Sequence, residues 1–162
     1  MGFQKILVAI DHSQQSPIIF DQALDLAKKE NAKLMVFHVV NLQGKGEVAP
    51  IIGTGVGLDL AAGKTIQQMQ HESFQAEIQT VKKEFQAYRQ KAEAKGVETE
   101  FKYDVGSPEA LICQVASECN ADLIVLGRRG RRGLTEILLG SVSSYVTHHA
   151  TCSVLIVQGI QS

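Results

Sequence analysis

The chain has 162 residues, of which 44% are hydrophobic and 20% charged, and its formal net charge is −1. A chain of this length buries roughly two-thirds of its unfolded surface, so residues 1–162 are predicted to form a single domain without disulfides or a structural metal. The near-neutral charge argues against a general affinity for nucleic acid or anionic membranes, and no apolar run reaches the ~20 residues of a membrane span.

The three cysteines form no CxxC pair and are odd in number: Cys113, Cys119 and Cys152. This pattern favours neither a disulfide framework nor a zinc knuckle. We interpret them as reduced thiols packed in or near the core of a cytoplasmic protein. The apolar run at the N-terminus is interpreted as a strand rather than as a signal peptide.

Strands and helices are predicted to alternate along the chain, because near-continuous Val, Ile and Leu blocks alternate with segments of helical periodicity. Ser-Pro pairs indicate helix starts, and a glycine indicates a helix end. In chain order we expect a strand over 5–10, a helix opening at Ser16-Pro17, a strand over 33–40, a helix over 64–95 that Gly96 ends, an edge strand over 99–105, a helix opening at Ser107-Pro108, a strand over 121–127, a helix from Ser141 through His149, and a strand over 153–158.

This alternation predicts an α/β fold with right-handed crossovers and helices on both faces of one sheet. We expect a doubly wound, Rossmann-like parallel sheet of five strands in the order 3-2-1-4-5. In such sheets ligands bind where the winding reverses, at the carboxyl ends of the strands. For this order the predicted crevice lies between Asp11, after the first strand, and Gly127, at the end of the fourth.

Residues 41–63 are rich in glycine and have no clear periodicity. A segment of this length without secondary structure is usually functional or mobile in a compact domain. We interpret it as a flexible loop and hypothesise that it forms a lid over the crevice.

Glycines punctuate the segment that follows the fourth strand, at Gly127, Gly130 and Gly140, and Ser141 then opens a helix. Glycines let the backbone approach a ligand closely, and a helix N-terminus offers free N–H groups to phosphate. The Ser141 and Ser143 hydroxyls are candidate additional donors, and Arg128 and Arg131 could pair with phosphate oxygens. The sequence therefore predicts a phosphate-binding loop here.

Four of the five arginines lie within residues 128–132, which also suggests a nucleic-acid patch. The neutral net charge and the lack of interleaved aromatic residues argue against nucleic-acid binding. His38 is interpreted as a satisfied core histidine. The adjacent pair His148-His149 points in directions about 100° apart on a helix, which disfavours a shared metal ion. No catalytic residue and no metal ligand is predicted.

The segment Gly127-x2-Gly130-x9-Gly140-Ser141 resembles the G-x2-G-x9-G-[S/T] nucleotide pattern of the universal stress protein family, in its UspA-type, ATP-binding subgroup. The resemblance extends over nearly the whole chain, through KILVAID, FHVV, VGSPEALI, ADLIVLGRRGRRGL and LLGSVSSYVTHHATCSVLIV. It implies an adenine-nucleotide-binding α/β domain, usually a homodimer, with ATP, accompanied by Mg²⁺, as the expected ligand. Carried over by position, the expected binding residues are Asp11, Val39, Gly127, Arg128, Gly130, Arg131, Gly140, Ser141, Val142 and Ser143.

Three functions remain open at this point. The first is a dimeric regulatory or stress-response protein that binds ATP and hydrolyses it slowly at most. The second is a phosphotransfer or nucleotidyl-transfer enzyme on the same fold, and the third is a sensor of AMP or cyclic AMP. Residues 153–158 would form an apolar sheet edge, at which the family commonly dimerises, so we expect a homodimer through this strand.

Overall fold

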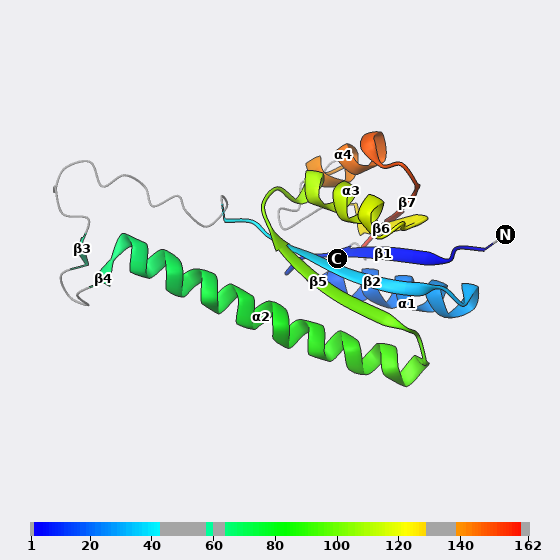
Figure 1. The fold of residues 1–162 in the computed structure, drawn as a ribbon, viewed down its shortest axis with the longest axis horizontal. Coiled ribbons are helices and arrows are strands. Elements are labelled where there is room, and N and C mark those ends of the chain that lie inside the picture. Colours follow the sequence, from blue (N-terminus) through cyan, green and yellow to red (C-terminus); the bar gives the residue numbers. More distant parts are fainter. Residues whose placement is uncertain (1, 43–57, 60–63, 129–138, 160–162) are drawn as a thin grey trace.

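The computed structural model describes residues 2–42, 58–59, 64–128 and 139–159. Within them strands and helices alternate, and Figure 1 shows their arrangement. In chain order the elements are β1 (Lys5–Ile10), α1 (Ser16–Glu30), β2 (Lys33–Val40), β3 (Leu58–Asp59), β4 (Lys64–Thr65), α2 (Ile66–Lys95), β5 (Thr99–Val105), α3 (Pro108–Glu118), β6 (Leu123–Gly127), α4 (Ser141–His149) and β7 (Ser153–Val157).

Five of these strands form one parallel sheet in the order β5-β2-β1-β6-β7. Numbered along the chain within this sheet, the order is 3-2-1-4-5, which confirms the predicted doubly wound topology. The central strand β1 pairs with β2 on one side, where Ile10 lies opposite His38, and with β6 on the other. The winding reverses between β1 and β6, so this fold opens its crevice there.

Helices cover both faces of the sheet, α1 and α2 on one side and α3 and α4 on the other (Figure 1). The alternation of side chains along β1 divides the core accordingly. Ile6, Val8 and Ile10 pack with α1 and α2, whereas Leu7 packs with α3 and α4. Burial of each such side chain stabilises the fold by about 1.5–3 kcal/mol, so the two layers fix which face every β1 residue occupies.

Helix α2 is the longest helix, and its apolar stripe follows the predicted pattern. Ile78, Val81, Phe85, Tyr88 and Ala92 are buried against the sheet, and Phe74 is partly buried. The residues from 65 to 76 are otherwise exposed, and this end of the helix extends past the sheet (Figure 1). In the described part of the chain no helix, α2 included, is long and apolar enough to cross a membrane.

The start of α2 lies two residues later than the sequence predicts. Lys64–Thr65 pairs in antiparallel fashion with Leu58–Asp59, so the helix begins at Ile66. Thr65 and Gln68 form a capping box, in which each side chain accepts a hydrogen bond from the other residue's backbone N–H. Most of the predicted 41–63 loop lies outside the described residues, so its role as a lid stays a hypothesis.

The two Ser-Pro pairs mark helix starts correctly, but neither serine caps its helix with its side chain. Gln15, and not Ser16, is the N-cap residue of α1. The Ser16 hydroxyl donates instead to the carboxylate of Asp11, which competes for the hydroxyl as a charged acceptor. Ser107 is the N-cap residue of α3 without a side-chain capping bond.

The cysteines pack against the α3–α4 side of the core as partly buried free thiols. Burial raises the pKa of the Cys113 thiol, and burial is also the largest cause of the raised pKa of Cys152. Both thiols are therefore less nucleophilic at neutral pH than an exposed cysteine.

Gly96 ends α2 in the left-handed conformation, with φ 69° and ψ 31°. A Cβ there would meet no atom within 4 Å, so a substitution acts through the backbone alone. We expect Gly96→Ala to lower the free energy of unfolding by about 1 kcal/mol, and Gly96→Asn to lower it by less, because asparagine tolerates this conformation better. Urea denaturation measures both effects; equal stability of the three proteins would contradict the expectation.

Candidate functional site

A pocket lies at the carboxyl ends of β1, β2 and β6, where α3 and α4 begin. This is where the doubly wound topology predicts a ligand crevice. Five segments of the chain line it, through Ala9, Ile10, Asp11, Ser16, Ile19, Phe37, Val39, Pro108, Ile112, Leu126, Gly127, Gly140, Ser141, Val142 and Ser143.

Most of the residues proposed from the sequence line this one pocket. Seven of the ten do so, from four separate segments: Asp11, Val39, Gly127, Gly140, Ser141, Val142 and Ser143. Arg128 follows the pocket residue Gly127, and its carbonyl accepts hydrogen bonds from Gly140 and Ser143, whereas Gly130 and Arg131 lie outside the described residues. The fold thus brings distant segments together as the sequence predicts, and their role in binding a ligand stays a prediction.

The turn between β1 and α1 holds Asp11 at the pocket. Its carboxylate Oδ1 accepts hydrogen bonds from the Ser13 backbone N–H, at 2.8 Å, and from the Ser16 hydroxyl, at 2.9 Å. The Ser16 oxygen in turn accepts a bond from the Asp11 backbone N–H at 3.0 Å. Three hydrogen bonds over six residues therefore fix the direction of this carboxylate.

The N-terminus of α4 is attached to the end of β6 through Arg128. The Arg128 carbonyl accepts bonds from the Gly140 N–H, at 2.9 Å, and from the Ser143 hydroxyl, at 2.8 Å. The Ser143 hydroxyl also lies 3.1 Å from the Gly140 carbonyl. The predicted role of this hydroxyl as a phosphate donor is therefore not supported by its geometry, because its proton is used within the chain.

The first amides of α4 remain as candidate donors. The first intrahelical bond runs from the Ser144 N–H to the Gly140 carbonyl, so the N–H groups of residues 141–143 have no intrahelical partner. Together with the helix dipole, they make this end of the pocket attractive to an anion. The pocket also carries the Asp11 carboxylate, and most of its remaining lining is apolar.

A second group of polar side chains lies on the other face of the sheet, between the ends of β1 and β2 and helix α2. His12 Nε2 hydrogen-bonds Glu77 Oε1, and His12 Nδ1 lies 3.0 Å from both carboxylate oxygens of Glu84. The rings of His12 and His38 lie 4.6 Å apart between centroids. The Nε2 atom of His38 lies 3.8 Å from Glu77 Oε1.

His38 is buried as the sequence predicts, with 2% of its surface exposed. It is not the satisfied core histidine expected, because its Nδ1 has no hydrogen-bond partner within the described part of the chain. Burial, followed by the neighbouring His12, lowers the pKa of His38 to about 4. Its ring is therefore a neutral imidazole at pH 7.

The sequence carries a signal for this second group in the spacing of two glutamates. Glu77 and Glu84 lie seven residues apart and flank Val81 on the buried stripe of α2. Carboxylates seven residues apart share one face of a helix, and two on a stripe that packs against a sheet need polar partners.

Comparison with known proteins shows the family of this chain. Residues 2–158 match the profile of the Universal stress protein family. The chain belongs to this family. The universal stress protein Sll1388 of Synechocystis sp. is 40% identical over 167 residues, which cover 98% of this chain and 99% of that protein. The universal stress protein YxiE of Bacillus subtilis is 37% identical over 161 residues, covering 96% of this chain and 99% of that one.

Solved structures of universal stress proteins share the fold. UspA from Lactobacillus plantarum matches with a TM-score of 0.78 and 24% identity, covering 97% of this chain and 99% of that one. A universal stress protein in complex with cAMP gives 0.65 at 24% identity and covers 98% of both chains. A family protein from Arabidopsis thaliana with AMP bound gives 0.64 at 18% identity, covering 97% of this chain and 92% of that one.

Ser141 and Ser143 form a matched pair for testing the geometry of the α4 N-terminus. Ser143 is buried and hydrogen-bonds the Arg128 carbonyl, whereas Ser141 is exposed. We expect Ser143→Ala to lower the free energy of unfolding by about 1–2 kcal/mol, because a buried hydrogen bond to the backbone is lost. Ser141→Ala should change it by less than about 0.5 kcal/mol. Chemical denaturation of both variants tests this; a larger loss for Ser141→Ala would contradict it.

Proposed function

We propose that this protein is an adenine-nucleotide-binding regulator of the cytoplasm, with ATP, accompanied by Mg²⁺, as its ligand. The observation that carries the proposal is the convergence of Asp11, Val39 and the α4 N-terminus on one pocket. These three features offer, in order, a carboxylate for a hydroxyl, the backbone at the end of a strand for a base and a helix N-terminus for phosphate.

The base and ribose would occupy the part of the pocket that the strands line. Phe37, Ile112 and Leu126 provide apolar contacts there, and the Val39 backbone would hydrogen-bond the edge of adenine. The Asp11 carboxylate suits a ribose hydroxyl, which donates, and repels a phosphate, which does not. This polarity directs the phosphates away from Asp11.

The phosphates would lie against Gly140 and the amides of residues 141–143. In this proposal Gly127 and Gly130 let the backbone approach the ribose and phosphates, and Arg128 and Arg131 pair with phosphate oxygens. The pocket volume of ≈ 180 Å³ is below the roughly 300–1,000 Å³ of sites that enclose a drug-sized ligand. A site of this size suits enclosure of the base or ribose with the phosphates nearer to solvent.

Relatives of the same fold support adenine recognition, since one is described in complex with cAMP and another with AMP bound. These ligands share adenosine and differ in their phosphates, so AMP and cyclic AMP are the alternative ligands. Asp11 is the one titratable side chain among the described residues that line the pocket. A single carboxylate held by Ser13 and Ser16 suits binding, so the proposal is regulation with slow hydrolysis at most, rather than phosphotransfer or nucleotidyl transfer.

The proposed regulator is a homodimer that pairs through residues 153–158. β7 is an edge strand of the sheet, and the Leu155 side chain is 39% exposed on it. An apolar edge strand favours pairing with a second copy of the same strand. A two-fold dimer would also let a nucleotide change the shape of the assembly.

A negative charge added at the α4 N-terminus tests nucleotide binding. We expect Ser141→Glu to weaken ATP binding at least ~30-fold, because a carboxylate at the α4 N-terminus repels phosphate and competes for its amides. Thr147→Glu, which adds the same charge near the other end of α4, is the matched control and should bind as the wild type does. Isothermal titration with ATP, AMP and cyclic AMP measures both variants and ranks the ligands.

Mass spectrometry of the nucleotide released from the purified protein identifies the natural ligand. Gly130→Val and Gly140→Val should reduce its amount, because each places a branched side chain on the proposed phosphate loop. Absence of any bound or bindable adenine nucleotide in the wild type would refute the proposal. Turnover of ATP at ordinary enzyme rates, abolished by Gly140→Ala, would refute the non-enzymatic reading.

The two edges of the sheet provide a matched test of dimerisation. Leu155 on β7 and Val105 on β5 are both 39% exposed. We expect Leu155→Glu to give monomers, since a buried unpaired carboxylate is costly in an apolar interface, and Val105→Glu to leave the dimer intact. Sedimentation velocity at micromolar concentration distinguishes them. A monomeric wild type would refute the dimer. Dissociation by Val105→Glu alone would place the interface at β5 instead of β7.

A further inference from the structure

We propose that His12, His38 and Glu77 form a zinc site between the sheet and helix α2, with Glu84 orienting His12. One ligand atom from each of these three side chains lies within 4.8 Å of the other two. Two imidazoles and a carboxylate are a ligand set that zinc commonly takes in proteins. The site lies on the opposite face of the sheet from the nucleotide pocket and does not depend on the proposed function.

His12 lies between two carboxylates of α2. Both of its ring nitrogens face carboxylate oxygens, those of Glu77 and Glu84. A neutral imidazole carries one N–H, so the lone pair of its other nitrogen would face a carboxylate oxygen. Glu77 is only 8% exposed, so its carboxylate is directed into the cluster, and an ion that it shares with His12 Nε2 would remove this contact.

His38 supplies the third ligand atom. His38 Nε2 lies 3.8 Å from Glu77 Oε1, which is too long for a hydrogen bond, and its Nδ1 has no hydrogen-bond partner among the described residues. Tetrahedral zinc with bonds of about 2.0–2.1 Å holds its ligand atoms about 3.3 Å apart. For zinc to enter, this pair would need to approach by about half an ångström, and the directly hydrogen-bonded His12–Glu77 pair would need to move apart.

Glu84 supplies the support that metal-bound histidines usually have. Its carboxylate oxygens lie 3.0 Å from His12 Nδ1, so this nitrogen donates to Glu84 and the Nε2 lone pair is directed at the proposed ion. Glu77 is also the first buried residue of α2, at the point where the helix begins to cover the sheet. The ion would thus connect α2 to the ends of β1 and β2 and fix the position of the helix along the sheet.

Zinc binding to the full-length, chelator-treated protein tests the proposal. Isothermal titration with Zn²⁺ should give one equivalent bound with sub-micromolar affinity and a zinc-dependent rise in Tm. His12→Asn, His38→Gln and Glu77→Gln should each weaken binding at least ~100-fold, and Glu84→Gln about 10- to 100-fold as an orienting residue. Cobalt(II) in place of zinc should give tetrahedral d–d absorption without thiolate charge-transfer bands.

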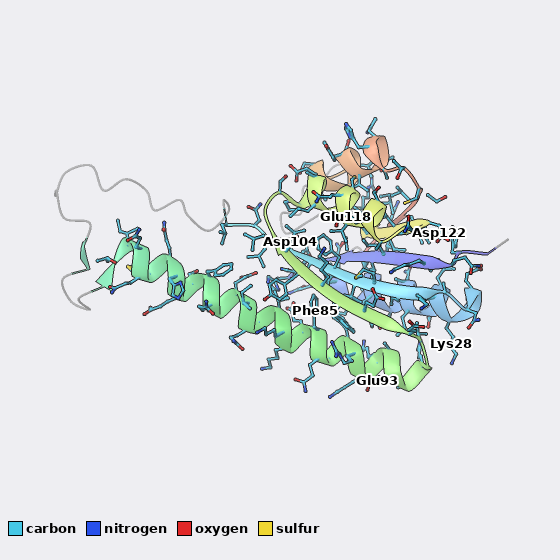
Figure 2. The ribbon with its side chains drawn as sticks, in the orientation of Figure 1. Lys28, Phe85, Glu93, Asp104, Glu118 and Asp122 are labelled. Carbon is cyan, nitrogen blue, oxygen red and sulfur yellow. The ribbon has the colours of Figure 1, made fainter. Side chains whose placement is uncertain are left out.

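Two controls separate this site from other histidines and carboxylates. Glu93→Gln alters an exposed carboxylate near the far end of α2 (Figure 2), and a His148→Asn/His149→Asn double variant removes the exposed histidine pair of α4. Both should bind zinc as the wild type does. Failure of the wild type to bind one equivalent, full affinity in Glu77→Gln, or thiolate bands with cobalt would each overturn the proposal. Circular dichroism confirms folding; if Glu77→Gln does not fold, His38→Gln and Glu84→Gln decide.

Discussion

The hydrogen bonds between Asp11 and Ser16 set the geometry on which both candidate sites depend. They close the turn that leads from the central strand β1 into α1, with the Asp11 carboxylate accepting at 2.9 Å and the Ser16 oxygen accepting from the Asp11 N–H at 3.0 Å. Such mutual bonds are worth about 1–3 kcal/mol each when they involve a charged partner. Without them the Asp11 carboxylate would keep only its hydrogen bond from the Ser13 N–H, and the turn that presents His12 to α2 would be less restrained.

The two candidate sites use neighbouring residues of the same two segments of the chain. Asp11 and Val39 face the pocket beside α3 and α4, whereas His12 and His38 face α2. In a strand, neighbouring side chains point to opposite faces, so the period of two that separates Val39 from His38 also separates the two chemistries. The carboxyl edge of this sheet therefore serves both of its faces, and the two sites share the β1–α1 turn.

The fold could be predicted from the sequence because its signals are local. Val, Ile and Leu blocks set the strands, three- and four-residue spacing set the buried stripe of α2, and the Ser-Pro pairs and Gly96 set helix ends. The position of the pocket then followed from the doubly wound topology. Local signals were less reliable where a side chain had two possible partners: Ser16 could cap α1 or bond Asp11, and the charged acceptor prevailed.

The group around His12 could not be placed from the sequence because it depends on how far α2 slides along the sheet. The periodicity of α2 defines which face is buried, but shifting the helix by one turn, about 5.4 Å, would keep an apolar face on the sheet and move Glu77 away from His12. Packing between distant segments sets the position of α2 along the sheet. Examples are the ring contacts between Phe85 and Phe101, with centroids 5.3 Å apart, and between Phe20 and Tyr88, with centroids 4.3 Å apart. Amphipathic patterning thus specifies the layers of this protein, and the side-chain contacts between layers specify which polar groups meet.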